Sequence, residues 1–478
     1  MRMSCAAGAT VLAVGLSYVG VAWLFCMHAP LAYMDEVFHF PQTQRYCEGR
    51  WDVWDPKITT FPGLYIVGTW LGTAVHFTQS FVQHDSPLCS LTVLRSANVL
   101  FSLGSLFLIV KLRSMKYSAS TATTGIVHGV AIALFPVHYF FSFLYYTDAG
   151  ALFFVLVMYY FAQVGRTDRL RRGAWTTSNL ISVASGFAAV GFRQTNVIWV
   201  VFVVGSEIVS DLEAAHATAL YGPGDGAAAS TAVGLDSTLL AFVVVLLKNS
   251  RRLFTLFWPH LSILVAFGIF LVYNGSITVG DKANHVATFH FGQILYFSVV
   301  CASGLGLACL DPQNVGRFFK TLGHRQSVGW AFLVGAIFLG LIFCFSDVHP
   351  FMLADNRHFT FYIWKRFFLK HPLMKLVPAP LYAYCLWLLW QNLRAATSPL
   401  RATVFFVATA LVLIPTPLVE PRYYIVPFVL YHVNAKNQPL HHLVWISVSY
   451  GVVNAWTISI YLFKPFTWPD GTEARFMW

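Results

Sequence analysis

Two adjacent acids, Asp35 and Glu36, follow directly behind the first apolar segment of the chain. A carboxylate beside a membrane surface has its proton affinity shifted by burial and by neighbouring charges. Such a group can take a proton from a sugar hydroxyl as a general base. Two acids at this place also suit the start of a helix, where carboxylates accept backbone N–H groups. The pair therefore indicates either catalysis at a bilayer surface or a helix cap.

Aromatic residues and two prolines follow the acids in the stretch WDPKITTFPGLY, residues 54–65. The prolines predict a bent, extended entry into the next helix. Trp54 and Tyr65 suit a membrane-interface belt and also a platform on which a sugar ring stacks. Asp55 and Lys57 either bind a substrate or form an ion pair with each other.

Four further polar insertions interrupt the apolar sequence. A cation at membrane depth, such as Arg193, is costly and usually functional. Each insertion alone is also explained by a snorkelling cation or a local ion pair. The four insertions are 192–196 (FRQTN), 280–290 (GDKANHVATFH), 349–366 (HPFMLADNRHFTFYIWKR) and 420–424 (EPRYY).

The elements that must position these residues are apolar helices. Residues 6–27 carry no charge, and at about 1.5 Å per residue they can cross roughly 30 Å of hydrocarbon. With 57% hydrophobic and 11% charged residues, the chain has the composition of an integral membrane protein. We expect a single all-α, polytopic domain over residues 1–478 with about thirteen crossings. They are 6–27, 91–110, 122–146, 149–165, 178–192, 197–209, 253–273, 291–310, 327–346, 376–393, 402–419, 423–433 and 442–463.

The basic residues predict the orientation of these crossings, because short cytosolic loops retain Lys and Arg. A cytosolic N-terminus places five short basic groups on the cytosolic side, which explains the net charge of +11 better than nucleic-acid binding does. An additional crossing at 239–247 would move the C-terminus to the other side. We expect a cytosolic loop at 210–252, with an Ala- and Gly-rich linker over 210–236. The polar insertions then share the opposite side, which receives residues 28–90, 193–196, 274–290, 347–375 and 420–424.

Cysteine and histidine spacing does not predict a metal site. The eight cysteines form no CxxC motif, and the 17 histidines form no HExxH motif. Cys47 and Cys89 both fall in the first non-cytosolic loop. They form either a disulfide or two packed thiols.

The combined chemistry favours an enzyme that transfers a sugar from a lipid phosphate. Arg and His donors among aromatics suit a phosphate whose lipid tail stays in the bilayer, and acids suit a polyhydroxyl acceptor. A transporter or channel-associated membrane protein without chemistry is the competing class, because transporters also place charges in broken spans. The concentration of polar groups on one side and the absence of an inverted repeat favour the enzyme.

The motifs in their order resemble a specific family, along nearly the whole chain. YMDEVFHFPQTQRYCEGRW, WDPKITTFPGLY, RQTN, GDKANHVAT, LADNRHFTFYIWKR and EPRYYIVP are similar to those of the eukaryotic alpha-1,2-glucosyltransferases of the endoplasmic reticulum. The resemblance implies a GT-C fold with a lumenal active site. It implies dolichyl-phosphate glucose as donor and a diglucosylated dolichyl-diphosphate oligosaccharide as acceptor. A sister mannosyl- or glucosyltransferase of the same pathway would share the fold.

The resemblance also implies roles for individual residues. An acid in the first lumenal loop acts as the base, which indicates Asp35, with Glu36 as the second candidate. From the chemistry of the leaving group, we assign neutralisation of the phosphate to Arg357, His358, Lys365, Arg366 or Arg422, and the sequence shows no requirement for a cofactor or a divalent metal. The full set of candidate substrate-binding residues is His39, Trp54, Asp55, Lys57, Tyr65, Arg193, Gln194, Asp281, Lys282, Asn284, His285, Asp355, Asn356, Arg357, His358, Lys365, Arg366, Glu420, Arg422 and Tyr423.

Overall fold

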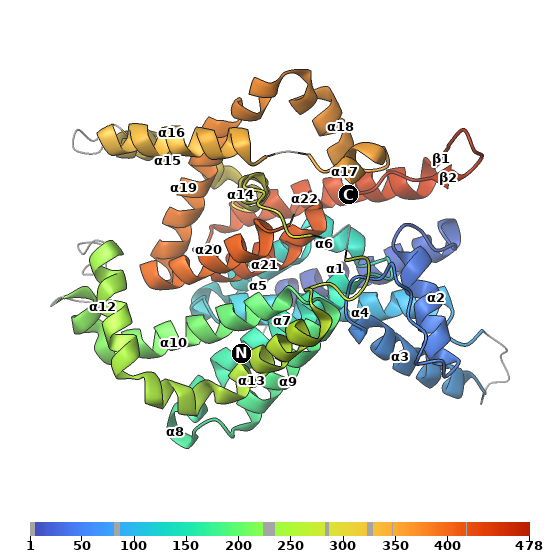
Figure 1. Ribbon diagram of the computed structural model, residues 1–478, viewed down its shortest axis with the longest axis horizontal. Coiled ribbons are helices and arrows are strands. Elements are labelled where there is room, and N and C mark those ends of the chain that lie inside the picture. The colour runs from blue at the N-terminus through green and yellow to red at the C-terminus, as the bar shows by residue number, and fades with distance from the viewer. Residues whose placement is uncertain are drawn as a thin grey trace.

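The computed structural model describes residues 5–80, 87–222, 235–282, 286–322, 328–346, 348–416 and 418–478. Within these ranges the chain is almost wholly helical (Figure 1). The only strands there are β1 (Phe466–Thr467) and β2 (Glu473–Ala474), which pair antiparallel near the C-terminus. The expected all-α class is therefore confirmed. Two residues of the predicted site, Asn284 and His285, lie outside the described residues.

Six of the described helices are long and apolar enough to cross a membrane, which supports a polytopic membrane protein. They are α1 (Cys5–His28), α4 (Leu91–Ser114), α7 (Thr147–Val164), α13 (Ser250–Asn274), α19 (Ala379–Ala396) and α22 (Leu440–Phe463). Shorter apolar helices accompany them: α5 (Ala122–Ala133), α9 (Thr177–Phe192), α14 (Gly292–Ser303), α16 (Val328–Cys344) and α20 (Pro399–Leu413). The number of thirteen crossings stays a prediction.

Two predicted segments differ in the structure. The predicted span 122–146 is broken, because Pro136 cannot continue a helix and instead begins α6 (Pro136–Phe141). The predicted linker 210–236 is partly helical, because α10 (Asn196–Tyr221) runs far beyond the expected span. Its acids Glu207 and Asp211 form ion pairs with arginines of α8 (Arg166–Arg172), which hold this extension in place.

The remaining helices are short or lie between the apolar ones. They are α2 (Glu36–Cys47), α3 (Gly63–Ser80), α12 (Leu235–Lys248), α15 (Pro312–Leu322), α17 (Pro350–Ala354), α18 (Phe359–Arg366) and α21 (Ile425–Asn434), with the 3-10 turns η1 (Ala119–Thr121), η2 (Gly306–Cys309), η3 (Phe368–Lys370), η4 (Pro372–Leu376) and η5 (Pro421–Tyr424).

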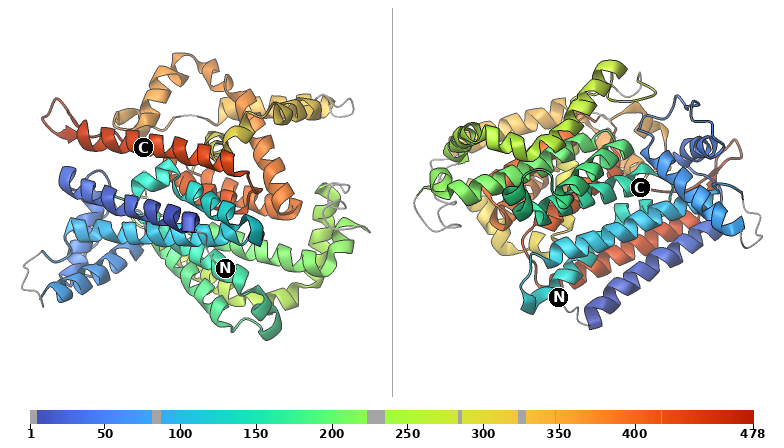
Figure 2. Two further views of the ribbon diagram at one scale, coloured as in Figure 1. Left: turned by 180° about the vertical axis from the view of Figure 1, so that it is seen from behind. Right: turned by 90° about the horizontal axis from the view of Figure 1, so that it is seen from below.

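The largest hydrophobic cluster joins helices from both ends of the sequence. Helices α1, α4 and α22 lie side by side in the right view of Figure 2. Phe25 of α1, Phe140 of α6 and Tyr461 of α22 contact one another, with ring centroids 5.2 to 6.2 Å apart. Aromatic pairs at these distances add to the energy of burial. The first and last helices are therefore packed into one core.

One glycine permits a close contact beside the site. A Cβ atom on Gly63 would lie 2.5 Å from the backbone oxygen of Gly191. Because glycine lacks this atom, the start of α3 can lie against the end of α9. The contact places the loop before α3 next to residues 193–196. Gln194 then donates a hydrogen bond from Nε2 to the Thr59 oxygen at 2.6 Å.

The connecting segments gather at two ends of the helical bundle. In Figure 1, α2, α3 and the β1–β2 hairpin lie to the right, and α8, α12 and α15 lie to the left. We call the first the Asp35 end; it contains residues 29–62, 193–196, 275–282, 348–376, 415–424 except 417, and 464–478. We call the second the Arg113 end; it contains residues 111–121, 163–176, 207–222, 304–322, 391–401 and 434–442. Arg113 holds this second end together, donating to the Val433 and Ala435 oxygens at 2.9 Å.

A disulfide fixes the outer part of the Asp35 end. Cys47, the last residue of α2, is bonded to Cys89, which precedes α4. Of the two alternatives open from the sequence, the structure has the disulfide. The bond ties the segment behind Asp35 to the helix bundle.

Candidate active site

Asp35 lies at the start of α2 but does not cap it. Its side chain makes no capping hydrogen bond. Instead, Oδ2 accepts a hydrogen bond from Nη1 of Arg422 at 2.6 Å. Its backbone N–H donates to the Tyr146 hydroxyl at 3.2 Å. The side chain is 35% exposed. The helix-cap interpretation is therefore wrong for Asp35, and its carboxylate faces the site.

Neighbouring charges keep Asp35 ionised. Burial raises the pKa of its carboxyl, but the positive charge of Arg422 outweighs burial and leaves the pKa below the ordinary value. His39 lies in α2 with Nδ1 2.7 Å from the Tyr65 hydroxyl. Burial lowers the pKa of His39 to about 4, so this histidine is neutral near neutral pH. The site thus contains an ionised acid and a neutral imidazole.

Glu36 points in the opposite direction and is fully buried. Its two oxygens accept hydrogen bonds from the Arg95 guanidinium at 2.8 and 2.6 Å. The backbone N–H groups of Tyr145 and Tyr33 donate to the same carboxylate at 2.6 and 3.1 Å. A carboxylate with this many donors connects α2 to α4 and to the start of α7. The geometry favours a structural role for Glu36 and leaves Asp35 as the acid that can reach a substrate.

Replacing Glu36 with Gln is expected to destabilise the protein by about 3–5 kcal/mol, the usual effect of breaking a buried ion pair. The side-chain amide of the variant places N–H groups against the Arg95 guanidinium and the backbone N–H groups, which need an acceptor. The melting temperature of the purified protein in detergent measures this loss. Glu48→Gln is the matched control, because Glu48 pairs with Arg50 on the exposed surface. A variant Glu36→Gln that is as stable as the parent but inactive would instead make Glu36 the base.

Arg193 and Arg422 line one cavity of about 150 Å³, which we call the polar cavity after these two cations. Arg193 forms an ion pair with Asp148, and Arg422 forms a second ion pair with Glu420. The Arg193 guanidinium lies over the Tyr423 ring, 5.1 Å from its centroid. Such stacking fixes the orientation of a guanidinium while its N–H groups remain available. The cavity therefore presents two oriented cations next to Asp35.

An apolar cavity of about 270 Å³ adjoins the polar one. Gln194 and Tyr423 line both cavities. The walls of the second cavity are mainly hydrophobic, including Ile198, Phe267 and Leu411. A ligand with a charged head and a hydrocarbon tail fits this pair of cavities, because the head meets arginines and the tail meets apolar side chains.

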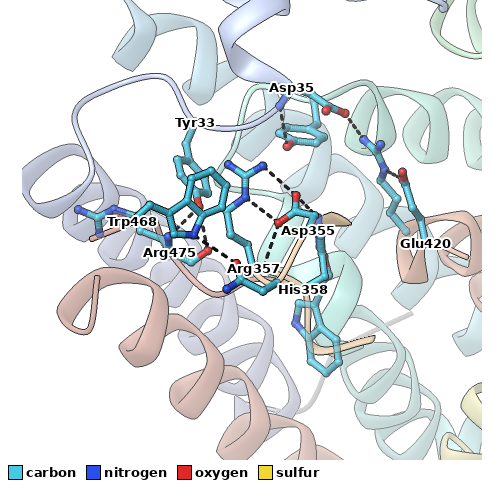
Figure 3. A network of polar contacts seen from close by, with 12 residues as sticks. Tyr33, Asp35, Asp355, Arg357, His358, Glu420, Trp468 and Arg475 are labelled. Atoms are coloured by element: carbon cyan, nitrogen blue, oxygen red, sulfur yellow. Dashed lines mark hydrogen bonds and ion pairs between the residues drawn. The ribbon is translucent and has the colours of Figure 1, made fainter. Parts of the chain in front are cut away.

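A second polar group lies beside Asp35 (Figure 3). Asp355 accepts two hydrogen bonds from the side chain of Arg357, each at 2.8 Å. The Arg357 guanidinium lies between two rings, 5.7 Å from the Tyr33 centroid and 4.8 Å from the Trp468 centroid. Trp468 also donates from Nε1 to the Asn356 side chain at 3.2 Å. Arg357 is thus firmly held, with Asp355 as its partner.

The C-terminal segment holds this group in place. Met477 pairs with His358 through a parallel backbone bridge. Nδ1 of His358 lies 2.7 Å from the main-chain oxygen of Trp478. The backbone N–H of Arg475 donates to the Tyr33 hydroxyl at 2.7 Å, and that hydroxyl donates to the Arg475 oxygen at 2.9 Å. The last residues of the chain therefore connect the first loop to the loop of Arg357.

Other predicted residues lie away from Asp35. Lys365 and Arg366 are exposed on α18, where each stacks on an aromatic ring of its own helix. The exposed Lys282 donates to the Asn274 oxygen at 2.5 Å, next to Asp281. These side chains are not brought to the polar cavity.

The stretch before α3 is more closely connected to the site. Trp54 packs edge-on against Tyr65, with centroids 5.7 Å apart. Asp55 accepts the backbone N–H of Lys57 at 3.0 Å, while the Lys57 amine lies 5.4 Å from the centroid of Phe38. The predicted pairing of Asp55 with Lys57 thus involves the backbone of Lys57.

Several residues of this site were not predicted from the sequence. Asp148 is the clearest, because it is buried at the start of α7 and carries the ion pair with Arg193. An acid at the beginning of an apolar span is a signal that could have identified it. Tyr33 and Tyr146 lacked such a signal. The C-terminal residues Trp468 and Arg475 lie beyond the last predicted span, so their contacts required the fold.

Among the described residues, no group of three or more His, Cys, Asp or Glu side chains is arranged to hold a metal ion. The charged groups of the site are instead paired with one another, either between distant segments of the chain or within one loop. An ionised acid, oriented arginines and adjoining polar and apolar cavities are suited to reactions of lipid phosphates.

The fold and the site together describe a helical protein with six helices, within the described residues, that are long and apolar enough to cross a membrane, and with a polar site at one end of the helix bundle. The chain belongs to the DIE2/ALG10 family, whose model matches residues 29–433.

Curated relatives cover nearly the same length. A mouse protein is 37% identical over 457 residues, covering 93% of both chains. An Arabidopsis thaliana protein is 32% identical over 500 residues, covering 94% of this chain and 95% of its own. A Drosophila melanogaster protein is 30% identical over 450 residues, covering 93% of both. All three are named Dol-P-Glc:Glc(2)Man(9)GlcNAc(2)-PP-Dol alpha-1,2-glucosyltransferase. No solved structure matches the chain.

Proposed function

We propose that this protein is a dolichyl-phosphate-glucose-dependent alpha-1,2-glucosyltransferase that adds the final glucose to Glc(2)Man(9)GlcNAc(2)-PP-Dol. The names of relatives that match over 93% of the chain support the donor and the acceptor. The structural observation that carries the proposal is the contact of Asp35 with Arg422 at the polar cavity. This arrangement supplies a base and a partner for a phosphate within one site.

The donor binds with its phosphate in the polar cavity and the start of its isoprenoid chain in the apolar one. Arg193 and Arg422 neutralise the phosphate, because a guanidinium offers paired donors to phosphate oxygens. Arg357 lines neither of the two cavities, and Lys365 and Arg366 are exposed on α18. Of the cations considered, Arg422 is therefore the first choice for the phosphate.

The reaction inverts the anomeric centre in one displacement. The acceptor 2-hydroxyl oxygen forms a bond to the anomeric carbon, the carbon–oxygen bond to phosphate breaks, and dolichyl phosphate leaves with the electron pair. Asp35 takes the hydroxyl proton as general base. Arg422 stabilises the charge that develops on the leaving phosphate.

This mechanism requires Asp35 and Arg422 to separate. They are in contact at 2.6 Å, whereas an in-line displacement places the base and the leaving phosphate on opposite faces of the sugar. We therefore place the donor glucose between them, with the phosphate replacing Asp35 as the partner of Arg422. The loss of this partner raises the pKa of Asp35 and makes it a stronger base when the donor is bound.

The protein adopts a GT-C fold with about thirteen crossings in the endoplasmic reticulum membrane, and the Asp35 end faces the lumen. The gathering of the first loop, residues 348–376 and the C-terminal segment at one end supports this orientation. The disulfide at the same end supports an oxidising compartment. The Arg113 end then faces the cytosol.

The orientation predicts where an introduced cysteine can be labelled. Cysteine at position 50 or 356 is expected to react with a membrane-impermeant maleimide only after the microsomal membrane has been permeabilised. Arg171→Cys at the Arg113 end is the matched control and is expected to react without permeabilisation. Labelling of position 50 or 356 from the cytosol in sealed microsomes would contradict the orientation.

Reconstitution tests the function. Purified protein is supplied with dolichyl-phosphate glucose and a diglucosylated lipid-linked acceptor, and the triglucosylated product is measured by mass spectrometry. A parallel reaction with dolichyl-phosphate mannose is expected to give no product. Transfer of mannose, or no transfer of glucose to this acceptor, would contradict the proposal.

A further inference from the structure

A cavity with a basic lining lies far from Asp35. It has a volume of about 1000 Å³ and lies at the Arg113 end, between α15, the end of α19 and the segment that joins α21 to α22. Helix α21 runs from the Arg422 turn to this cavity, and its 10 residues span about 15 Å. The cavity is therefore a separate feature that the proposed transfer reaction does not use.

Its lining is strongly basic. Arg317, Lys320, Arg394 and Lys436 line the cavity, whereas Asp311 is its only acid within the described residues. Asp311 already accepts the backbone N–H of Gln313 at 2.9 Å, at the start of α15. Lys320, Arg394 and Lys436 form no ion pair with any acid that the structure describes. Cations that line one cavity without acidic partners favour an anionic ligand.

One wall of the cavity is apolar. Leu305, Trp387 and Leu388 lie among the basic residues. The Trp387 indole N–H is buried and has no acceptor in the described part of the chain. A site with cations on one side and hydrocarbon on the other suits an amphiphile better than a small soluble anion.

The neighbouring helix α15 has the character of a membrane-surface helix. Its Phe318 is buried, packing 5.6 Å from Trp387, while Phe319 is 63% exposed and shares an outer face with Leu322. Arg317 and Lys320 lie on the cavity side. The helix connects two apolar helices, α14 and α16. A helix with exposed apolar residues beside basic ones lies at the boundary between lipid and water.

We propose that this cavity binds the phosphate headgroup of an anionic membrane lipid. The basic residues of α15, α19 and the α21–α22 segment donate to the phosphate oxygens. The lipid chain leaves along the wall of Trp387 and Leu388 into the bilayer. The positive-inside rule explains why these basic residues lie on the cytosolic side, but it does not explain why they line one cavity.

Binding of short-chain lipids to the purified full-length protein in detergent tests this site. Dioctanoyl phosphatidic acid is the probe, dioctanoyl phosphatidylcholine is the neutral comparison, and inorganic phosphate is the soluble one. The combined variant Lys320→Ala, Arg394→Ala, Lys436→Ala is expected to bind phosphatidic acid at least tenfold more weakly, as the loss of charge-assisted contacts predicts. Phosphatidylcholine and inorganic phosphate are expected to bind at least tenfold more weakly than phosphatidic acid to the parent protein.

The matched control removes the same number of charges from the same end outside the cavity. The triple variant Lys111→Ala, Arg171→Ala, Arg172→Ala replaces exposed basic residues and is expected to change the affinity less than about threefold, as for screened surface charges. If the combined variant is not recovered folded, the single substitution Lys320→Glu at an exposed residue is measured in its place, with Arg172→Glu as its control. An equal loss of phosphatidic acid affinity in a cavity variant and in its control would mean that the lipid is attracted by the overall charge of this end. That result would overturn the site. Tight binding of inorganic phosphate would overturn the lipid assignment, and no binding of phosphatidic acid would overturn the proposal.

Discussion

Replacing Asp35 with Asn is expected to lower kcat by about 10²- to 10⁴-fold, the range for loss of a general base. The amide keeps the shape of the side chain and one acceptor oxygen but cannot take a proton. The folded protein should remain, because Asp35 is partly exposed and its side chain does not cap α2. Initial rates at saturating donor and acceptor, with melting temperatures of parent and variant, measure the effect.

Asp55→Asn is the matched control for this substitution. Asp55 is also an acid of the same loop, but its carboxylate accepts the backbone N–H of Lys57, a role that Asn retains. Its kcat is expected to stay within about twofold of the parent, since surface substitutions of this kind have small effects. A variant Asp35→Asn with normal kcat would rule out Asp35 as the base.

Replacing Arg422 with Ala is expected to raise the donor KM and lower kcat/KM by about ten- to a hundredfold, or more if kcat also falls. The variant lacks the guanidinium that contacts Asp35 and that is proposed to bind the donor phosphate. Arg422→Lys should recover only part of the loss, because an ammonium lacks the paired donors of a guanidinium. The measurement is the separate variation of donor and acceptor concentration, with the acceptor KM expected to change less.

Arg422→Ala also has an expected effect on pH dependence. In the parent protein, burial raises the pKa of Asp35, but the charge of Arg422 outweighs it and holds the pKa below its ordinary value. Asp35 is active as a base only when ionised, so its activity is lost as the pH falls through this pKa. Without Arg422 the pKa rises, and the acid limb of kcat/KM should move to higher pH.

Arg366→Ala provides the comparison for both measurements, because Arg366 is an exposed cation stacked on Tyr362. Its donor KM and its acid limb should match those of the parent. An Arg422→Ala variant with the same donor KM and the same acid limb as Arg366→Ala would contradict the role of Arg422 in the phosphate site.

The sequence was sufficient to predict a helical membrane protein and to single out several residues that the structure brings together at the Asp35 end. Long uncharged apolar stretches such as 6–27 predicted membrane helices, because hydrocarbon excludes unpaired polar groups. The basic loops predicted that the polar insertions share one side. Asp35, Arg193 and Arg422 stood out because charges next to or within apolar segments are costly.

The pairing of these residues depended on the tertiary structure. Asp35 and Glu36 are equivalent candidates in the sequence, yet one faces Arg422 and the other is buried against Arg95. Their difference arises because adjacent side chains on a helix point in different directions, toward different neighbours. Only the packing of the surrounding helices specifies those neighbours.

The same reason applies to Asp148 and to the C-terminal residues. Composition and hydrophobic periodicity report that a segment is apolar, but they do not say which distant segment it contacts. Asp148 meets Arg193 because α7 packs against α9, and Arg475 meets Tyr33 because the first and last helices share one core. The sequence by itself determined the kind of helices and the chemistry available at their ends. The tertiary packing decided which of these charges meet, because each contact joins segments that are far apart in the sequence.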